Sequence, residues 1–128
     1  MNEILIDTNF YTEIMRGSEE SRHIVRRAKK IVMCPIVIGE LFYGFKNGTR
    51  EKRNVEQLQD FLFLPSVETL SITYKTSEFF ALIMHQLKKS GNPIPTNDLW
   101  IAACAIEHGL AVATNDSHFK KIANLLIV

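Results

Sequence analysis

The sequence is poor in cysteine and has no long apolar run. Its two cysteines, Cys34 and Cys104, lie far apart in the chain and in apolar surroundings, so we expect reduced, buried thiols in a cytoplasmic protein. No apolar stretch is long enough to span a bilayer. The residues before Ile4 contain neither a basic lead-in nor a cleavage site, so we expect no signal peptide. These absences argue against a membrane protein and against a disulfide-stabilised scaffold.

Several catalytic signatures are also missing. The sequence contains no Gly-rich phosphate-binding loop, no nucleophile elbow and no Cys–His pairing. Its histidines form no i, i+4 pair and no cluster with cysteine, so a zinc site is not expected; they are His23, His85, His108 and His118. The acidic residues are therefore the remaining candidates for a catalytic or metal-binding site.

Positive charge is modest, because the formal net charge is only +1. Basic residues nevertheless gather in two groups, Arg22, Arg26, Arg27, Lys29 and Lys30, and then Lys46, Arg50, Lys52 and Arg53. Such groups can contact phosphates, although a solvated helix face is the simpler interpretation of either one.

Length and patterning favour one α/β domain over residues 1–128. A chain of 128 residues with 46% hydrophobic residues can bury a sizeable core. Short apolar runs predict strands at 4–6, 31–34, 67–70 and 110–113, with 125–128 as a candidate fifth. Helical patterns predict helices at 7–17, 19–30, 35–45, 49–62 capped by Thr49, 73–89, 96–108 capped by Thr96, and 117–122. This alternation predicts a parallel sheet covered by helices on both faces.

Aspartate is scarce, and three of the four aspartates share an unusual setting with one glutamate. Asp7, Glu40, Asp98 and Asp116 are each the only formally charged residue in a long uncharged stretch. An ionised carboxylate in apolar surroundings is costly unless it is paired or bound to a cation, and no basic partner is close in sequence. One shared Mg²⁺ ion would satisfy all four, because this ion takes oxygen ligands.

The expected positions of these acids support a shared site. Asp7 and Asp116 follow apolar strands, and ligands of open parallel sheets bind at the carboxyl ends of strands. Asp98 lies in the first turn of an almost wholly apolar helix, where the helix dipole favours an anion. Glu40 interrupts another apolar helix, in which Gly39 and Gly44 are expected to permit close packing of neighbouring backbone.

Each acid also has a simpler structural interpretation. Asp7 and Asp116 can act as helix caps, and Asp98 can merely complement the helix dipole. Glu40 is hardest to explain in this way, because an acid in the middle of an apolar helix needs a partner. The shared-site hypothesis is preferred because it accounts for all four residues together.

These residues also carry a family resemblance that covers the whole chain. Residues 6–9 (IDTN) resemble the opening motif of PIN domains, and residues 38–44 (IGELFYG) resemble the second motif of VapC-type toxins within that superfamily. Residues 97–103 (NDLWIAA) resemble the third motif and residues 114–119 (TNDSHF) the fourth. A single motif of this kind is weak, whereas the ordered set of four is specific.

The resemblance implies a PIN-like three-layer α/β/α sandwich with a central parallel β-sheet. It also implies a Mg²⁺- or Mn²⁺-dependent endoribonuclease, commonly a homodimer, that is silenced by a small VapB-like antitoxin whose tail enters the active site. The family's acidic positions match Asp7, Glu40, Asp98 and Asp116, and Thr8, Asn9 and Thr114 match polar residues that support them.

The implied chemistry is metal-assisted hydrolysis of RNA phosphodiester bonds. Asp7, Asp98 and Asp116 would hold the metal, while Glu40 would bind a second ion or orient the attacking water. One alternative is a receiver-like phosphoacceptor module, which usually carries paired acids after its first strand and a lysine after its last, whereas here Asp7 stands alone. The other alternative is a PIN domain that binds RNA without cutting it.

Overall fold

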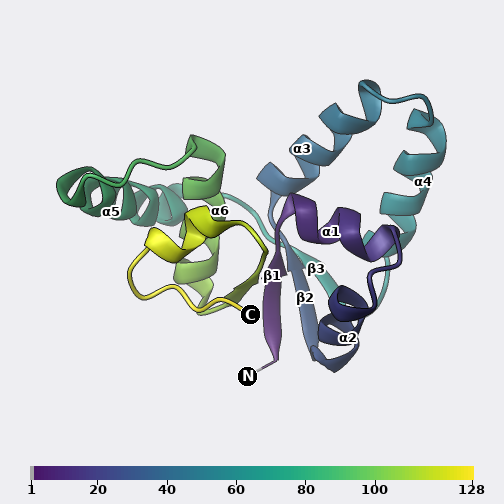
Figure 1. Ribbon diagram of the computed structural model, residues 1–128, viewed down its shortest axis with the longest axis horizontal. Coiled ribbons are helices and arrows are strands. Elements are labelled where there is room, and N and C mark those ends of the chain that lie inside the picture. The colour runs from purple at the N-terminus through teal and green to yellow at the C-terminus, as the bar shows by residue number, and fades with distance from the viewer. Residues whose placement is uncertain (1) are drawn as a thin grey trace.

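The computed structural model describes residues 2–128, in which strands and helices alternate along the chain (Figure 1). The elements are β1 (Glu3–Ile6), α1 (Thr8–Met15), α2 (Glu19–Arg27), β2 (Lys30–Met33), α3 (Pro35–Lys46), α4 (Glu51–Leu62), β3 (Val67–Thr69), α5 (Tyr74–Ser90), α6 (Thr96–His108), β4 (Ala111–Ala113) and the 3₁₀ helix η1 (Ser117–Lys121). The predicted α/β fold class is confirmed.

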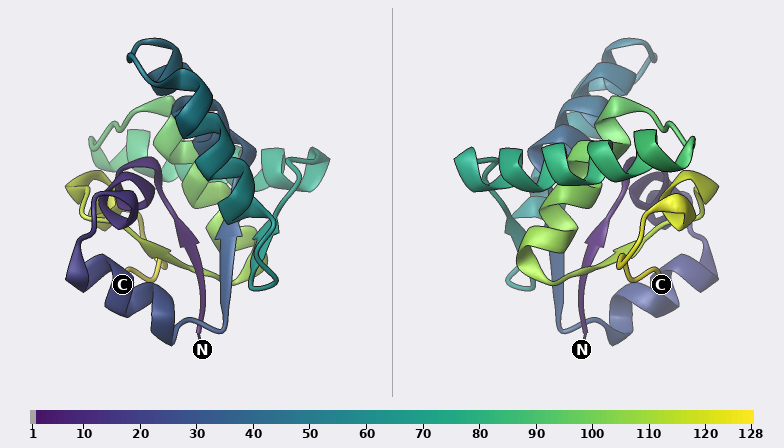
Figure 2. Two further views of the ribbon diagram at one scale, coloured as in Figure 1. Left: turned by 90° about the vertical axis from the view of Figure 1, so that its right-hand side faces the viewer. Right: turned by 90° about the vertical axis from the view of Figure 1, so that its left-hand side faces the viewer.

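The four strands form one parallel sheet in the order β3-β2-β1-β4. The connections from β1 to β2 and from β2 to β3 advance in one direction, and the connection from β3 to β4 returns across the sheet. Because such crossovers are right-handed, the reversal places α1 to α4 on one face and α5 and α6 on the other. Figure 1 shows these three layers, and the right-hand view of Figure 2 shows α5 and α6 in front of the sheet.

This reversal also creates a place for a ligand. β1 and β4 are neighbours in the sheet, although the chain leaves β1 into the helices of one face and reaches β4 from those of the other. The segments that follow β1 and β4, which begin α1 and η1, therefore leave the sheet toward opposite faces. A crevice at such a switch point is the usual binding site of an open parallel sheet.

The core lies between the sheet and its two helical layers. Ile4, Leu5 and Ile6 of β1 are at most 5% exposed, and burying each such side chain contributes about 1.5–3 kcal/mol. α6 packs six buried residues against the sheet and α5, most of them small: Leu99, Ile101, Ala102, Ala103, Cys104 and Ala105. α6 therefore has a fixed position, and so does the first turn that carries Asp98.

The predicted N-caps of α4 and α6 are wrong. Thr49 and Thr96 do not cap α4 and α6, because Arg50 and Pro95 hold the N-cap positions. The carbonyl of Arg50 accepts from the N–H of Asn54 and that of Pro95 accepts from the N–H of Leu99, so each helix begins after these residues. The predicted end of α6 at Gly109 is confirmed, because this glycine adopts a left-handed conformation with φ +66°.

Two further expectations differ from the structure. The helix expected over 19–30 ends at Arg27, because Lys30 already pairs with Glu3 in the sheet. The strand expected at 125–128 is reduced to one bridge between Val112 and Ile127. Asn124, with φ +65°, turns the chain just before that bridge.

The two cysteines are buried, free thiols, and they meet in space. Their Sγ atoms are 3.3 Å apart, although the residues are 70 positions apart in the chain. Cys34 is the N-cap of α3 and Cys104 lies in α6, so the contact joins the two helices that carry Glu40 and Asp98. Among residues 2–128, none of the helices combines the length and apolar character needed to cross a membrane.

Candidate active site

All four isolated acids line one cavity of about 930 Å³ at the carboxyl ends of β1 and β4. Asp7 directly follows β1, and Asp116 lies between β4 and η1. Glu40 comes from the middle of α3 and Asp98 from the first turn of α6. Residues more than 100 positions apart are thus brought together by the parallel sheet and the two helices that flank its switch point.

Asp7 is both a helix cap and a wall of the cavity. Its Oδ1 accepts a 2.8 Å hydrogen bond from the N–H of Phe10, which caps α1. Its Oδ2 accepts a hydrogen bond from the hydroxyl of Thr114. The cap interpretation is therefore correct for Asp7, but it does not exclude a further role, because a carboxylate has about four acceptor sites and these two bonds use two of them.

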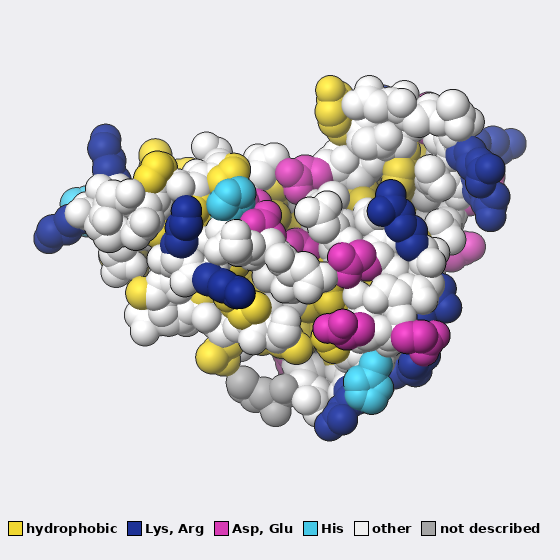
Figure 3. Space-filling view, in the orientation of Figure 1, with side chains coloured by type: hydrophobic (Ala, Val, Ile, Leu, Met, Phe, Trp, Pro, Cys, Tyr) yellow, Lys and Arg dark blue, Asp and Glu magenta, His cyan; other side chains and the backbone are white. Residues whose placement is uncertain are grey.

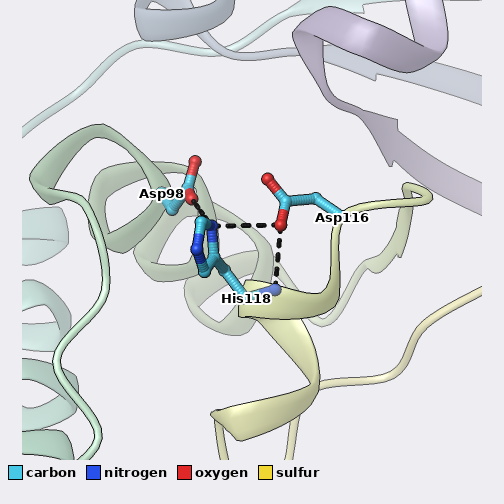
Figure 4. Close-up of side chains that lie close together, drawn as sticks. All are labelled: Asp98, Asp116 and His118. Carbon is cyan, nitrogen blue, oxygen red and sulfur yellow. Dashed lines mark hydrogen bonds and ion pairs between the residues drawn. The ribbon is translucent and has the colours of Figure 1, made fainter.

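Asp98, Asp116 and His118 form a compact group (Figure 4). His118 Nδ1 lies 3.1 Å from Asp98 Oδ2 and 3.0 Å from Asp116 Oδ1. Asp116 Oδ1 also accepts a 2.9 Å hydrogen bond from the N–H of His118, so Asp116 caps η1 as its structural interpretation expected. The N–H of Asp116 in turn donates to Thr114 Oγ1, which links this group to Asp7.

Glu40 finds its partners in two other elements. Its Oε1 accepts from the hydroxyl of Thr8 at 2.5 Å, and its Oε2 accepts from the side-chain amide of Asn97 at 3.1 Å. Both oxygens are therefore oriented by neutral donors. The expectation that Gly39 and Gly44 permit close backbone packing is wrong, because a Cβ atom at either position would meet nothing within 4 Å.

The electrostatics of the cavity disfavour its negative charges. Burial raises the pKa of Asp7, and Asp116 and Asp98 raise it further, against the lowering effect of the hydrogen bonds from Thr114 and Phe10. Burial likewise raises the pKa of Asp98, followed by the charge of Asp116, while His118 opposes this shift. In the part of the chain that the structure describes, the lining of this cavity includes no Lys or Arg. Figure 3 shows several acidic side chains at the centre of this face, with basic side chains to either side of them.

This donor set fits a divalent cation. Carboxylate oxygens are the ligands that Mg²⁺ and Mn²⁺ prefer in proteins. A bound cation would relieve the repulsion among Asp7, Asp98 and Asp116, which no Lys or Arg of the cavity lining offsets. Among the described residues, ligand atoms of Asp98, Asp116 and His118 lie within 4.8 Å of one another, and Asp7, which is not in that group, lines the same cavity.

The predicted supporting residues lie where they can act on the acids, and two others were missed. Thr8 donates to Glu40 and Thr114 to Asp7, while Asn9 lines the cavity. Asn97, which orients Glu40, and His118 are not among the predicted site residues, because an amide shows no charge signal and no second histidine or cysteine lies at ligand spacing from His118. The signal for both was their position inside the motifs at 97–103 and 114–119.

The two basic groups of the sequence lie outside the cavity lining. Several of their members form ion pairs on the surface instead: Arg26 with Glu19, Lys30 with Glu68, and Lys46 with Glu51. These exposed pairs contribute little to stability. The two basic groups therefore agree with the simpler interpretation, in which they are solvated surface residues.

A comparison with known protein families matches a stretch of the chain that contains all four acids. A PIN domain model matches residues 4–125. Among curated proteins, ribonuclease VapC2 of Haemophilus influenzae is 30% identical, with 98% of this chain and 96% of that protein covered. Ribonuclease VapC2 of Rickettsia felis is 27% identical, with 96% and 94% covered.

Solved structures give the same fold. The chain superposes with a TM-score of 0.87 and 25% identity on a chain of the Rickettsia felis VapBC2 complex bound to a DNA fragment from its promoter, covering 98% and 97% of the two chains. A DNA-bound VapBC complex from Salmonella typhimurium gives a TM-score of 0.85 at 24% identity, covering 100% of this chain and 98% of that one. The second likeness supports the fold alone.

Proposed function

This chain belongs to the PIN domain family, and we propose from this premise that its residues 1–128 form one metal-dependent endoribonuclease, the toxin of a toxin–antitoxin pair. It hydrolyses RNA phosphodiester bonds with Mg²⁺ or Mn²⁺ as cofactor. The observation that carries the proposal is the convergence of Asp7, Glu40, Asp98 and Asp116 on one cavity whose described lining includes no Lys or Arg. The curated relatives are named ribonucleases, which supports RNA as the substrate.

The residues divide into two roles. Asp7, Asp98 and Asp116 would hold the cation, which when bound supplies Lewis-acid chemistry by polarising the phosphate and lowering the pKa of water. Glu40 would bind a second ion or orient the attacking water, with its carboxylate held in place by the bonds from Thr8 and Asn97. Thr114 positions Asp7 and the Asp116 backbone through a single hydroxyl.

The direct test is incubation of the pure protein with total RNA. Cleavage should occur with Mg²⁺ or Mn²⁺, stop in excess EDTA and return when the ion is restored. Cleavage that persists in EDTA would overturn the metal mechanism. Binding of RNA without any cleavage would favour the alternative of a non-catalytic PIN domain. No observation favours the receiver-like alternative, because the PIN domain match spans residues 4–125.

The proposed partners are a second copy of the chain and a small antitoxin. The solved relatives include complexes described as VapBC, which supports an antitoxin partner. Its tail would bring an Arg or Lys to the carboxylates of the cavity. The outer surface of α3 offers this partner an apolar contact, since Phe42 and Tyr43 are exposed, whereas Phe10 and Ile14 of α1 are buried and offer none.

Growth measurements test the toxin assignment separately from the nuclease assignment. Expression of this chain alone should arrest bacterial growth, and co-expression of the product of the neighbouring gene should restore it. A chain that is harmless at high level would refute the toxin role and leave the nuclease proposal intact.

A further inference from the structure

We propose that His118 is a nitrogen ligand of the cation in this cavity and that it makes the site prefer a first-row transition ion such as Mn²⁺ over Mg²⁺. The inference rests on the proposed metal-dependent function, and it adds a ligand that the four acidic motif positions do not contain. It starts from the place of the imidazole, whose Nδ1 contacts Asp98 and Asp116 at once (Figure 4).

The spacing of the three atoms suits one coordination sphere. Adjacent ligands of an octahedral ion with bonds of about 2.1 Å lie about 3.0 Å apart. His118 Nδ1 is 3.1 Å from Asp98 Oδ2 and 3.0 Å from Asp116 Oδ1, and all three atoms lie within 4.8 Å of one another. Nδ1 carries at most one proton and cannot donate a full hydrogen bond to each carboxylate, whereas one cation can bind all three.

The backbone holds the imidazole in this place. The N–H of His118 donates to Asp116 Oδ1, and the N–H of Asp116 donates to Thr114 Oγ1. The next residue, Phe119, is 1% exposed and anchors η1 in the core. The ring itself is open to the cavity, with 41% of the His118 side chain exposed. A ligand needs both properties, a fixed backbone and an accessible nitrogen.

Ligand chemistry then predicts the ion preference. Mg²⁺ favours oxygen donors and retains several waters, so an imidazole adds little to its binding. Transition ions gain more from imidazole, and their affinities rise from Mn²⁺ through Co²⁺ and beyond. With His118 as an additional ligand, the cavity should therefore favour Mn²⁺ over Mg²⁺ more strongly than a site built from Asp7, Asp98 and Asp116 alone.

The test compares three proteins by isothermal titration with Mn²⁺ and with Mg²⁺ in separate experiments. They are the wild type, His118→Asn, and His85→Asn as the matched control, since His85 is exposed on α5 away from the cavity. Asparagine at 118 offers an amide oxygen near the place of Nδ1, so Mg²⁺ affinity should change little. The ratio of Mn²⁺ to Mg²⁺ affinity should fall about tenfold or more in His118→Asn and remain unchanged in His85→Asn.

Electron paramagnetic resonance gives an independent readout on the same proteins. The spin echo of bound Mn²⁺ should show modulation from a directly bound imidazole nitrogen in wild type and His85→Asn, and lose it in His118→Asn. An unchanged affinity ratio together with no nitrogen modulation would overturn the inference while leaving the metal site in place. If the wild type binds neither ion, the inference and the metal-dependent function are both overturned.

Discussion

Asp7 is the residue at which the structural and the chemical role can be separated by two substitutions. Its carboxylate caps α1 through Phe10, accepts from Thr114, and lies among the charges of Asp98 and Asp116. Asp7→Asn removes the charge and keeps a side chain that caps helices well. Its amide oxygen can keep the bond from Phe10, and its amide nitrogen can donate to Thr114 Oγ1 in place of accepting from it. Asp7→Ala removes the charge and every hydrogen bond at this position, so the difference between the two variants measures the cap and the contact with Thr114.

The magnitudes follow from those contacts. Loss of an Asp cap costs about 1 kcal/mol, and this cap is lost in Asp7→Ala and kept in Asp7→Asn. Asp7→Ala should therefore be less stable than Asp7→Asn by about 1 kcal/mol or more, which is about 4 °C in melting temperature for a chain of this length. Asp7→Asn should melt at or above wild type at neutral pH, because the substitution removes a buried charge and its repulsion from Asp116.

The sign of the pH dependence gives a second check on the same pair. Because the pKa of Asp7 is raised from 3.8, the folded state binds this proton more tightly than the unfolded state. The resulting stability is present below the unfolded pKa and is lost as pH rises through the folded pKa. The advantage of Asp7→Asn over wild type should therefore shrink as pH is lowered toward 3.8.

Melting curves in EDTA for wild type, Asp7→Asn and Asp7→Ala, recorded from neutral pH downward, test all of these statements. If Asp7→Asn melts well below wild type at neutral pH, the charge of Asp7 contributes to stability rather than opposing it. The electrostatic account of the cavity would then be refuted.

Three other predictions concern the cavity and the core. Added Mg²⁺ should raise the melting temperature of wild type, because a ligand that binds only the folded state stabilises it. The rise should be smaller for Asp98→Asn, and an equal rise would argue against Asp98 as a ligand. Glu40→Gln should remain folded, because an amide still bonds Thr8 or Asn97, and lose most RNA cleavage, whereas full activity would exclude Glu40 from the chemistry. Cys34 and Cys104, both 0% exposed, should react with a thiol reagent only as fast as the chain unfolds, and rapid labelling of the folded protein would contradict their burial.

The strands and the acids at their ends were predictable because local patterns determine them. Ile4 to Ile6 form a continuous apolar run, and parallel strands bring their carboxyl ends to one edge, so Asp7 and Asp116 were expected near each other. The two interpretations of Asp7 were not exclusive, since one oxygen caps α1 while the other faces Thr114.

The contacts between distant helices were not predictable in the same way. Asn97 meets Glu40 across 57 positions, and Cys34 meets Cys104 across 70, because of how α3 and α6 pack against the sheet. No sequence period encodes that packing. His118 was not predictable from histidine and cysteine spacing, because its partners in the fold are the acids Asp98 and Asp116.

The rate of RNA cleavage by Asp98→Asn at saturating Mg²⁺ tests the central claim most directly. Asp98 lies in the first turn of α6 and contacts His118 in the cavity, and asparagine is nearly isosteric with it, so the variant should fold. If the carboxylates of this cavity hold the catalytic cation, cleavage should fall by orders of magnitude while melting in EDTA is unchanged or higher. A folded Asp98→Asn protein that cleaves RNA as fast as wild type would contradict the account.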